Sequence, residues 1–333
     1  MRRCRRCVLP DDFPRVRLDN EGVCNVCRSY KGKRDSSRLR REYKKKFESL
    51  ARQYSGRNEY DILMCYSGGK DSTYTLSLLK DVYKLRILAF TFDNGFMPER
   101  TAVNIRNVVE KLGVDHIFFK PNFDILKKIF REAAKRALYP PKAIERASTI
   151  CTSCMGLVKY LSLKTAIEKE IPLIAFGWSP GQAPVTSSVL KINPVMIKSM
   201  EKVIKEPLFR IIGRDIGAYF LNERHYARAE KFPIFIHPLA FHGYNEKKIL
   251  EKIKKLGWEM PHGVELNATN CYLNPFADEV HIAKYHFHPY ALEIAALVRE
   301  GCMTREEGLK HMPVRKNQKI VKLAKKRLGL SRE

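Results

Sequence analysis

The chain has 333 residues, of which 44% are hydrophobic and 29% are charged. This length and composition predict one large or two moderate folded domains and exclude a disordered or low-complexity protein. No apolar stretch is long enough to span a bilayer, and no apolar segment follows Met1-Arg2-Arg3-Cys4. We therefore expect a cytoplasmic protein with no membrane attachment.

The net charge of +26 is concentrated at the two ends of the chain. Residues 1–60 hold 18 Lys and Arg against 8 Asp and Glu, and residues 310–333 hold 9 against Glu333 alone. The ends therefore carry surpluses of ten and eight positive charges, which make up 18 of the 26. Such clustering is typical of proteins that bind a polyanion and favours RNA. A lysine-rich solvated surface is the alternative.

Residues 1–33 are predicted to form a small zinc ribbon. Six of the nine cysteines form three C-x-x-C pairs, and two of these pairs lie here, as Cys4-x2-Cys7-x16-Cys24-x2-Cys27. Four thiolates at this spacing match a closed tetrahedral Zn²⁺ site. A segment this short has little core, so the metal would supply much of its folding free energy. Iron in the same site and a redox dithiol are the alternatives.

Residues 34–58 are predicted to form a linker helix, because Leu39, Tyr43, Phe47, Leu50 and Tyr54 recur at helical spacing. Strands and helices then alternate over residues 59–240. The strands are expected at Tyr60–Tyr66, Arg86–Phe92, His116–Phe119 and Ile171–Phe176, and the helices at Ser72–Leu85 and Thr101–Leu112. This alternation predicts an α/β fold with a doubly wound, Rossmann-like parallel sheet that binds ligands at the carboxyl ends of its strands.

A phosphate-binding loop is predicted directly after the first of these strands, at Ser67-Gly68-Gly69-Lys70-Asp71-Ser72. Two adjacent glycines leave backbone N–H groups uncovered, and a helix N-terminus, Lys70 and two hydroxyl groups favour an anion. The spacing is not that of a Walker loop. A tight strand-to-helix turn without a ligand is the alternative.

A second group of cysteines is predicted to do chemistry inside the nucleotide domain. Cys151-Thr152-Ser153-Cys154 is expected just before a helix that contains Met155–Ala166, and Cys271 lies in a polar loop. Three cysteines can hold a [4Fe–4S] cluster and leave one iron open for a ligand such as sulfide. A catalytic persulfide pair and a structural dithiol are the alternatives.

Residues 241–333 are predicted to be a helical region that contacts substrate or a partner. Asn245 is expected to cap a helix that ends at Gly257, and further helices are expected at His288–Glu300 and Thr304–His311. The spacing Thr304-x-x-Glu307 predicts a capping box. The segment from Asp278 to His288 is expected to be a polar surface between domains, and a substrate-facing basic loop is the alternative.

Two resemblances add an activity to these patterns. Ser-Gly-Gly-x-Asp-Ser after a strand resembles the signature of the PP-loop ATP pyrophosphatases, which adenylate a substrate oxygen with ATP and release pyrophosphate. The order of this loop, a C-x-x-C pair and one distant cysteine resembles the iron–sulfur-dependent tRNA thiolases of that family. The two ends, Cys4-x-x-Cys7-Val-Leu-Pro and Leu297–Glu307, resemble N-acetyl sugar amidotransferases instead.

The resemblance implies roles for individual residues. ATP would lie on Ser67, Gly68, Gly69, Lys70, Asp71 and Ser72, with Phe92, Asp93 and Gly177 also at the nucleotide. Lys70 and Asp71 would be catalytic, and Asp71 would help to hold Mg²⁺. Cys151 and Cys154 would also be catalytic and, with Cys271, would hold the [4Fe–4S] cluster. For Asp93, a turn before Gly95 is the alternative.

The preferred function is therefore adenylation of a substrate oxygen followed by transfer of sulfur, with a tRNA base as the acceptor. The first alternative is an ATP-dependent N-acetyl sugar amidotransferase that uses ammonia from a glutaminase partner. The second alternative is a non-catalytic zinc-ribbon protein that binds RNA. The expected partners are tRNA, a sulfur donor or a glutaminase subunit, and a second copy of the chain as a homodimer.

Overall fold

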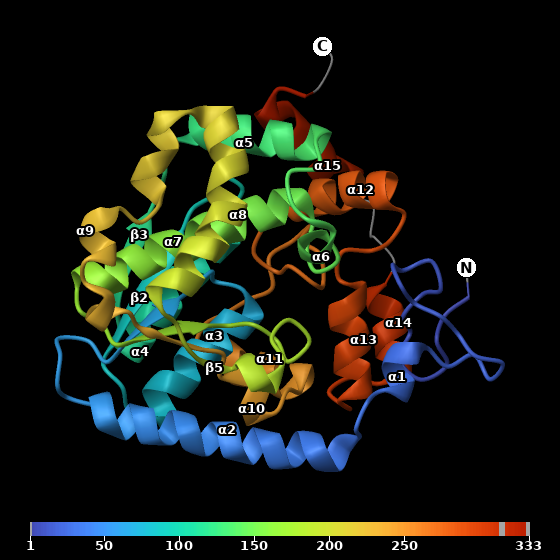
Figure 1. Ribbon diagram of the computed structural model, residues 1–333, viewed down its shortest axis with the longest axis horizontal. Helices are drawn as coiled ribbons and strands as arrows, with labels where there is room; N and C mark the ends of the chain where they lie inside the picture. The colour runs from blue at the N-terminus through green and yellow to red at the C-terminus, as the bar shows by residue number, and fades with distance from the viewer. Residues whose placement is uncertain (1, 313–316, 331–333) are drawn as a thin grey trace.

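The computed structural model describes residues 2–312 and 317–330. Its centre is a six-stranded sheet in the order β3-β2-β1-β4-β6-β5 (Figure 1). The strands are β1 (Ile62–Cys65), β2 (Ile87–Phe92), β3 (Asp115–Phe119), β4 (Leu173–Phe176), β5 (Val189–Lys191) and β6 (Ile234–Ile236). All neighbouring pairs are parallel except β5 with β6. The predicted α/β fold with a parallel sheet is confirmed.

Helices cover both faces of the sheet. The first two are α1 (Asn25–Arg28) and α2 (Lys33–Tyr54). The central part of the chain contains α3 (Lys70–Ser77), which continues as a π-helical turn at Leu78–Val82, α4 (Glu99–Leu112), α5 (Phe123–Lys135), α6 (Pro141–Ile144), α7 (Thr149–Glu168), α8 (Pro194–Ile212), α9 (Glu223–Tyr226), α10 (Leu239–His242) and α11 (Glu246–Lys254). The last four are α12 (Asn274–Tyr285), α13 (Ala291–Arg299), α14 (Arg305–His311) and α15 (Gln318–Leu328). Short 3₁₀ turns lie at Val185–Ser187, Arg214–Tyr219 and Ala229–Lys231.

The central strand β1 explains the layering. All four of its residues are buried, as expected for a parallel strand covered on both faces. Ile62 and Met64 belong to a core with α3, α4 and α11, whereas Leu63 and Cys65 belong to a second core with α5 and α7. The chain runs from β1 to β2 on one side and returns to β4 on the other, so the strand order reverses at β1. This switch point is where such sheets bind ligands.

The N-terminal segment packs against the C-terminal helices, although the two are far apart in the sequence (Figure 1). The rings of Phe13 and Phe287 are 4.8 Å apart, centroid to centroid. Arg15 donates to Glu145 at 2.7 Å, and Arg40 at the start of α2 donates to Glu300 at 2.9 Å. The division into 1–33, 34–58, 59–240 and 241–333 stays a prediction. Of the basic segment 310–333, residues 313–316 and 331–333 lie outside the described part.

The local helix predictions compare well with the structure. The Asn245 side chain caps α11, and Thr304 and Glu307 form the predicted capping box. Cys151 and Cys154 do not precede their helix but lie in its first two turns, because the Ser148 side chain caps α7 at Thr149. Within the described residues, no helix is both long enough and apolar enough to cross a membrane.

One further prediction is wrong. The segment from Asp278 to His288 is not a polar surface: it lies mostly in α12, and the side chains of Asp278, His281 and His288 are buried. The sheet also contains two strands that the sequence analysis does not predict, β5 and β6. Each of these strands has three residues, too few for an alternating pattern to appear in the sequence.

Candidate active site

A cavity of about 270 Å³ opens at the carboxyl ends of β1, β2 and β4. Residues of α7 and of the segment 267–274 complete its walls. The predicted site residues that line it are Ser67, Gly69, Lys70, Asp71, Ser72, Phe92, Cys151, Cys154, Gly177 and Cys271. The structure thus brings the predicted phosphate loop and the three internal cysteines to one place.

The phosphate loop has the shape that close anion approach requires. Gly68 has φ +75°, and a Cβ there would lie 2.7 Å from Ile105. Gly69, the N-cap residue of α3, has no side chain that could cap the helix, and both Gly69 and the first turn of α3 line the cavity. A Cβ on Gly177 would lie 2.5 Å from the Cα atom of Ser72. Both strand ends therefore need glycine for steric reasons.

Three hydrogen bonds from the C-terminal part of the chain hold this loop. The Trp258 indole donates to the Gly68 carbonyl at 2.9 Å, and the Lys70 backbone N–H donates to Thr269 Oγ1 at 3.1 Å. The Asn270 side chain donates to the Ser67 carbonyl at 3.1 Å. Because Asn270 precedes Cys271, these bonds also bring that cysteine to the cavity.

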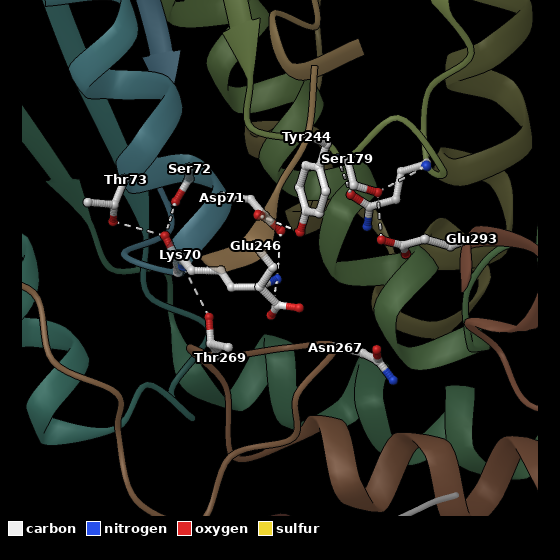
Figure 2. A network of polar contacts seen from close by, with 12 residues as sticks. Lys70, Asp71, Ser72, Thr73, Ser179, Tyr244, Glu246, Asn267, Thr269 and Glu293 are labelled. Atoms are coloured by element: carbon white, nitrogen blue, oxygen red, sulfur yellow. Dashed lines mark hydrogen bonds and ion pairs between the residues drawn. The ribbon is translucent and has the colours of Figure 1, made fainter. Parts of the chain in front are cut away.

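Lys70 lies in a buried network of polar side chains (Figure 2). Its Nζ is 3.0 Å from Asp71 Oδ2 and 3.7 Å from Glu246 Oε1, and the Tyr244 hydroxyl donates to Asp71 Oδ1 at 2.9 Å. Burial lowers the pKa of Lys70, but the negative charges of Asp71 and Glu246 outweigh it and raise this pKa well above its usual value. Lys70 is therefore held as a cation beside the cavity.

A second carboxyl group approaches from α13. Glu293 Oε1 accepts a hydrogen bond from Ser179 Oγ at 2.7 Å, in the loop that follows β4 (Figure 2). A Cβ on Gly181 would lie 2.4 Å from the Glu293 carbonyl oxygen, so this loop fits closely on α13. Burial raises the pKa of Glu293 to about 7, although the Ser179 hydrogen bond lowers it.

The three internal cysteines receive amide N–H donors from two asparagines. Asn94 Nδ2 lies 3.3 Å from Cys271 Sγ and 3.7 Å from Cys154 Sγ. Asn274 Nδ2 lies 3.9 Å from Cys151 Sγ. Burial raises the pKa of Cys151 to about 12 and also raises the pKa values of Cys154 and Cys271. All three are free of disulfides.

The four N-terminal cysteines form a separate, tighter group. Their sulfur atoms lie within 4.8 Å of one another, with 3.8 Å between Cys4 and Cys27 and 3.7 Å between Cys7 and Cys24. Tetrahedral metal–sulfur bonds of about 2.3 Å place sulfurs about 3.8 Å apart. Backbone N–H groups of Arg6 and Cys24 point at Cys4 Sγ, at 3.4 and 3.3 Å. This arrangement suits one metal ion.

Asp93 does not line the cavity. Its Oδ1 accepts the backbone N–H of Gly95 at 2.8 Å, and its Oδ2 lies 4.0 Å from Lys120 Nζ. The geometry is that of the turn named as the alternative role for Asp93. Gly68 does not line the cavity either, and its carbonyl accepts the hydrogen bond of the Trp258 indole.

Sequence reasoning missed several side chains at this site. Tyr244 lies in the turn before α11, Glu246 begins α11, and Glu293 lies in α13. The amide groups of Asn94 and Asn274 point at the cysteines. Glu246 directly follows the helix cap Asn245, and an acidic residue at this position is usual in a helix without any role in a site. No short motif surrounds the others, so only the fold reveals them.

No family model matches the chain. An uncharacterised protein of Methanocaldococcus jannaschii is 26% identical over 273 residues, which cover 82% of this chain and 79% of that protein. The tRNA-cytidine(32) 2-sulfurtransferase of Ralstonia pickettii is 27% identical over 218 residues, which cover 60% of this chain and 61% of that enzyme. The resemblance to PP-loop enzymes that the loop Ser67–Ser72 indicates is confirmed.

Two solved structures cover most of the chain. The U34-tRNA thiolase NcsA from Methanococcus maripaludis, solved with its [4Fe-4S] cluster, has 17% identity and a TM-score of 0.38, covering 100% of this chain and 99% of its own. NMN synthetase from Francisella tularensis has 11% identity and a TM-score of 0.40, covering 88% and 98%. The fold of this chain is therefore described by its own strand order, β3-β2-β1-β4-β6-β5.

Glu293 is expected to make stability depend on pH. The folded chain holds this proton up to about pH 7, whereas the ordinary pKa is 4.5. The contribution of Glu293 to the free energy of unfolding is fully present below pH 4.5 and is lost as the pH rises through about 7, a change on the order of 3 kcal/mol. The thermal unfolding midpoint of Glu293→Gln should change less with pH between 5 and 8 than that of the wild type. Exposed Glu110→Gln is the control, and parallel profiles for the wild type and Glu293→Gln would contradict the assignment.

Proposed function

We propose that the chain is an ATP-dependent sulfurtransferase that adenylates a base of tRNA and then replaces the activated oxygen by sulfur. The observation that supports this proposal is the shared cavity, because residues of the loop Ser67–Ser72 and three cysteines line the same space. The sequence similarity to a tRNA-cytidine(32) 2-sulfurtransferase and the clustered positive charge support tRNA as the substrate.

The first half-reaction uses the loop after β1. The ATP phosphates bind at the N-terminus of α3, and Lys70 offsets the charge that develops on pyrophosphate. The Asp71 carboxylate faces the cavity and offers oxygen ligands of the kind that Mg²⁺ prefers. A carbonyl oxygen of the base attacks the α-phosphorus, forming an O–P bond while the bond to pyrophosphate breaks. The carbonyl oxygen, a poor leaving group on its own, can then leave the carbon as part of AMP.

The second half-reaction uses the cysteine side of the cavity. Cys151, Cys154 and Cys271 fit a [4Fe–4S] cluster, because they line the same cavity and receive N–H donors, an arrangement that stabilises cluster sulfurs. When bound, such a cluster supplies an open iron that can carry sulfide. Sulfide adds to the activated carbon, the C–S bond forms, and AMP leaves with the electrons of the C–O bond. Asn94 and Asn274 orient the three sulfurs toward this position.

The N-terminal four-cysteine group has a different role. We assign it to structural Zn²⁺, because four buried thiolates leave no open coordination position. Phe13 and Arg15 of this segment contact Phe287 and Glu145. The metal therefore supports the packing of the ribbon on the chain that completes the active site.

Removing one internal thiolate should separate the two half-reactions. With ATP, sulfide and an unmodified tRNA pool, anaerobic Cys271→Ser should release pyrophosphate within about threefold of the wild-type rate and incorporate sulfur at least about 100-fold more slowly. Cys302→Ser is the matched control, since Cys302 lies near Arg40, away from the cavity. Normal sulfur incorporation by Cys271→Ser would contradict the role of the three cysteines. A wild-type protein that releases no pyrophosphate would contradict adenylation.

The ribbon metal is expected to stabilise the chain without taking part in catalysis. Cys24→Ser should lose about one zinc per chain and unfold at a lower temperature, because the other three thiolates lose most of their affinity. Metal analysis and thermal unfolding measure both effects. Unchanged zinc content in Cys24→Ser would show that the four sulfurs do not bind zinc.

A further inference from the structure

A second cavity, of about 610 Å³, lies between the N-terminal segment and α13. Its walls come from five parts of the chain: the end of the ribbon with the start of α2, the turn after α6, the loop after β4, α10, and α13. Neither the phosphate loop nor any internal cysteine lines it. The cavity is therefore distinct from the candidate active site.

The walls of this cavity are strongly basic. Five cationic side chains line it, contributed by Lys31, Arg38, Arg40, Arg146 and Arg299, against two carboxylates, Asp35 and Glu300. Arg40 donates to Glu300 at 2.9 Å, which accounts for one of these carboxylates. Among the described residues, no ion pair joins Lys31, Arg38, Arg146 or Arg299 to an acid. An excess of like charge around one cavity disfavours the empty state and favours an anion.

Arg299 is the strongest sign of a missing ligand. Its Nη1 atom is buried, and within residues 2–312 and 317–330 it has no hydrogen-bond partner. A buried N–H of a charged group without a partner costs about 1–3 kcal/mol or more. The charge of Arg299 also reaches Cys7 of the ribbon, but no sulfur lies within hydrogen-bond distance of Nη1. A guanidinium with a free N–H favours a phosphate or carboxylate oxygen.

The cavity is coupled to the active site through one loop. Pro180 and Gly181 line it, whereas Gly177 and Gln182 of the same loop line the active-site cavity. Ser179, between them, donates to Glu293 of α13. A ligand that extends past this loop can therefore contact both cavities.

We propose that this second cavity binds phosphate groups of the tRNA backbone while the target base lies in the active site. The proposal rests on the proposed function, because it takes tRNA as the substrate. A backbone fits better than a single small anion, since the cations come from separated segments around a space larger than the active-site cavity. Phosphate contacts of this kind position a nucleic acid without reading its sequence.

The test uses the full chain, purified without oxygen, and measures tRNA binding over a range of KCl concentrations. Arg38→Gln and Arg146→Gln are suitable variants, because both side chains are exposed and their loss leaves the core intact. Each should weaken tRNA binding about 5–10-fold near 0.1 M salt and reduce the slope of log K against log salt by about one. Arg146→Lys should keep the slope. Arg106→Gln, on an exposed site of α4 that lines neither cavity, should change affinity less than about twofold.

The outcomes separate this proposal from the proposed function. Wild-type slope and affinity in Arg38→Gln and Arg146→Gln would overturn the backbone site while leaving sulfur transfer to tRNA intact. A wild-type chain that does not bind tRNA at low salt would overturn both. In a second arm, inorganic phosphate at constant ionic strength should not displace tRNA. Displacement that depends on Arg299, tested with Arg299→Gln, would identify a free-phosphate site instead and overturn the backbone assignment.

Discussion

The candidate active site depends on the docking of the C-terminal part of the chain onto the phosphate loop. The Trp258 indole, Thr269 and Asn270 make three hydrogen bonds to the backbone of Gly68, Lys70 and Ser67. Each such bond contributes about 1 kcal/mol, but leaving a buried backbone group without a partner costs more. The same contacts fix Cys271, the next residue in the chain, on the cavity wall. The docking therefore brings a cysteine to the same cavity as the loop Ser67–Ser72.

Electrostatics then divide the cavity into two sides. On the phosphate side, Lys70 is held as a cation by Asp71 and Glu246, so the positive charge is in place before a nucleotide arrives. On the cysteine side, burial disfavours free thiolates, which makes a positive metal centre the natural partner of three sulfurs. In the proposed reaction, the first side would favour departure of pyrophosphate from phosphorus, and the second side would favour attack of a sulfur nucleophile on the activated carbon.

The sequence predicts those parts of this arrangement that have local signals. The strand before Ser67, the glycines of the loop and the spacing of Cys4, Cys7, Cys24 and Cys27 are short-range patterns, and the structure contains the corresponding elements. Contacts between distant segments leave no such pattern. Glu293 and Trp258 reach the site only because the C-terminal part of the chain folds back over the sheet, and the contact of Asn94 with Cys271 depends on the same folding. The sequence predicts His281 on a polar surface, but the side chain is buried in α12.

The central claim is that the internal cysteines hold iron beside the ATP loop while the ribbon cysteines hold zinc. Anomalous scattering from anaerobic crystals, recorded at the iron and zinc absorption edges, tests it most directly. The account predicts an iron peak enclosed by Cys151, Cys154 and Cys271 and a zinc peak enclosed by the four ribbon cysteines. Crystals with zinc in the ribbon but no iron at the internal cysteines would contradict it.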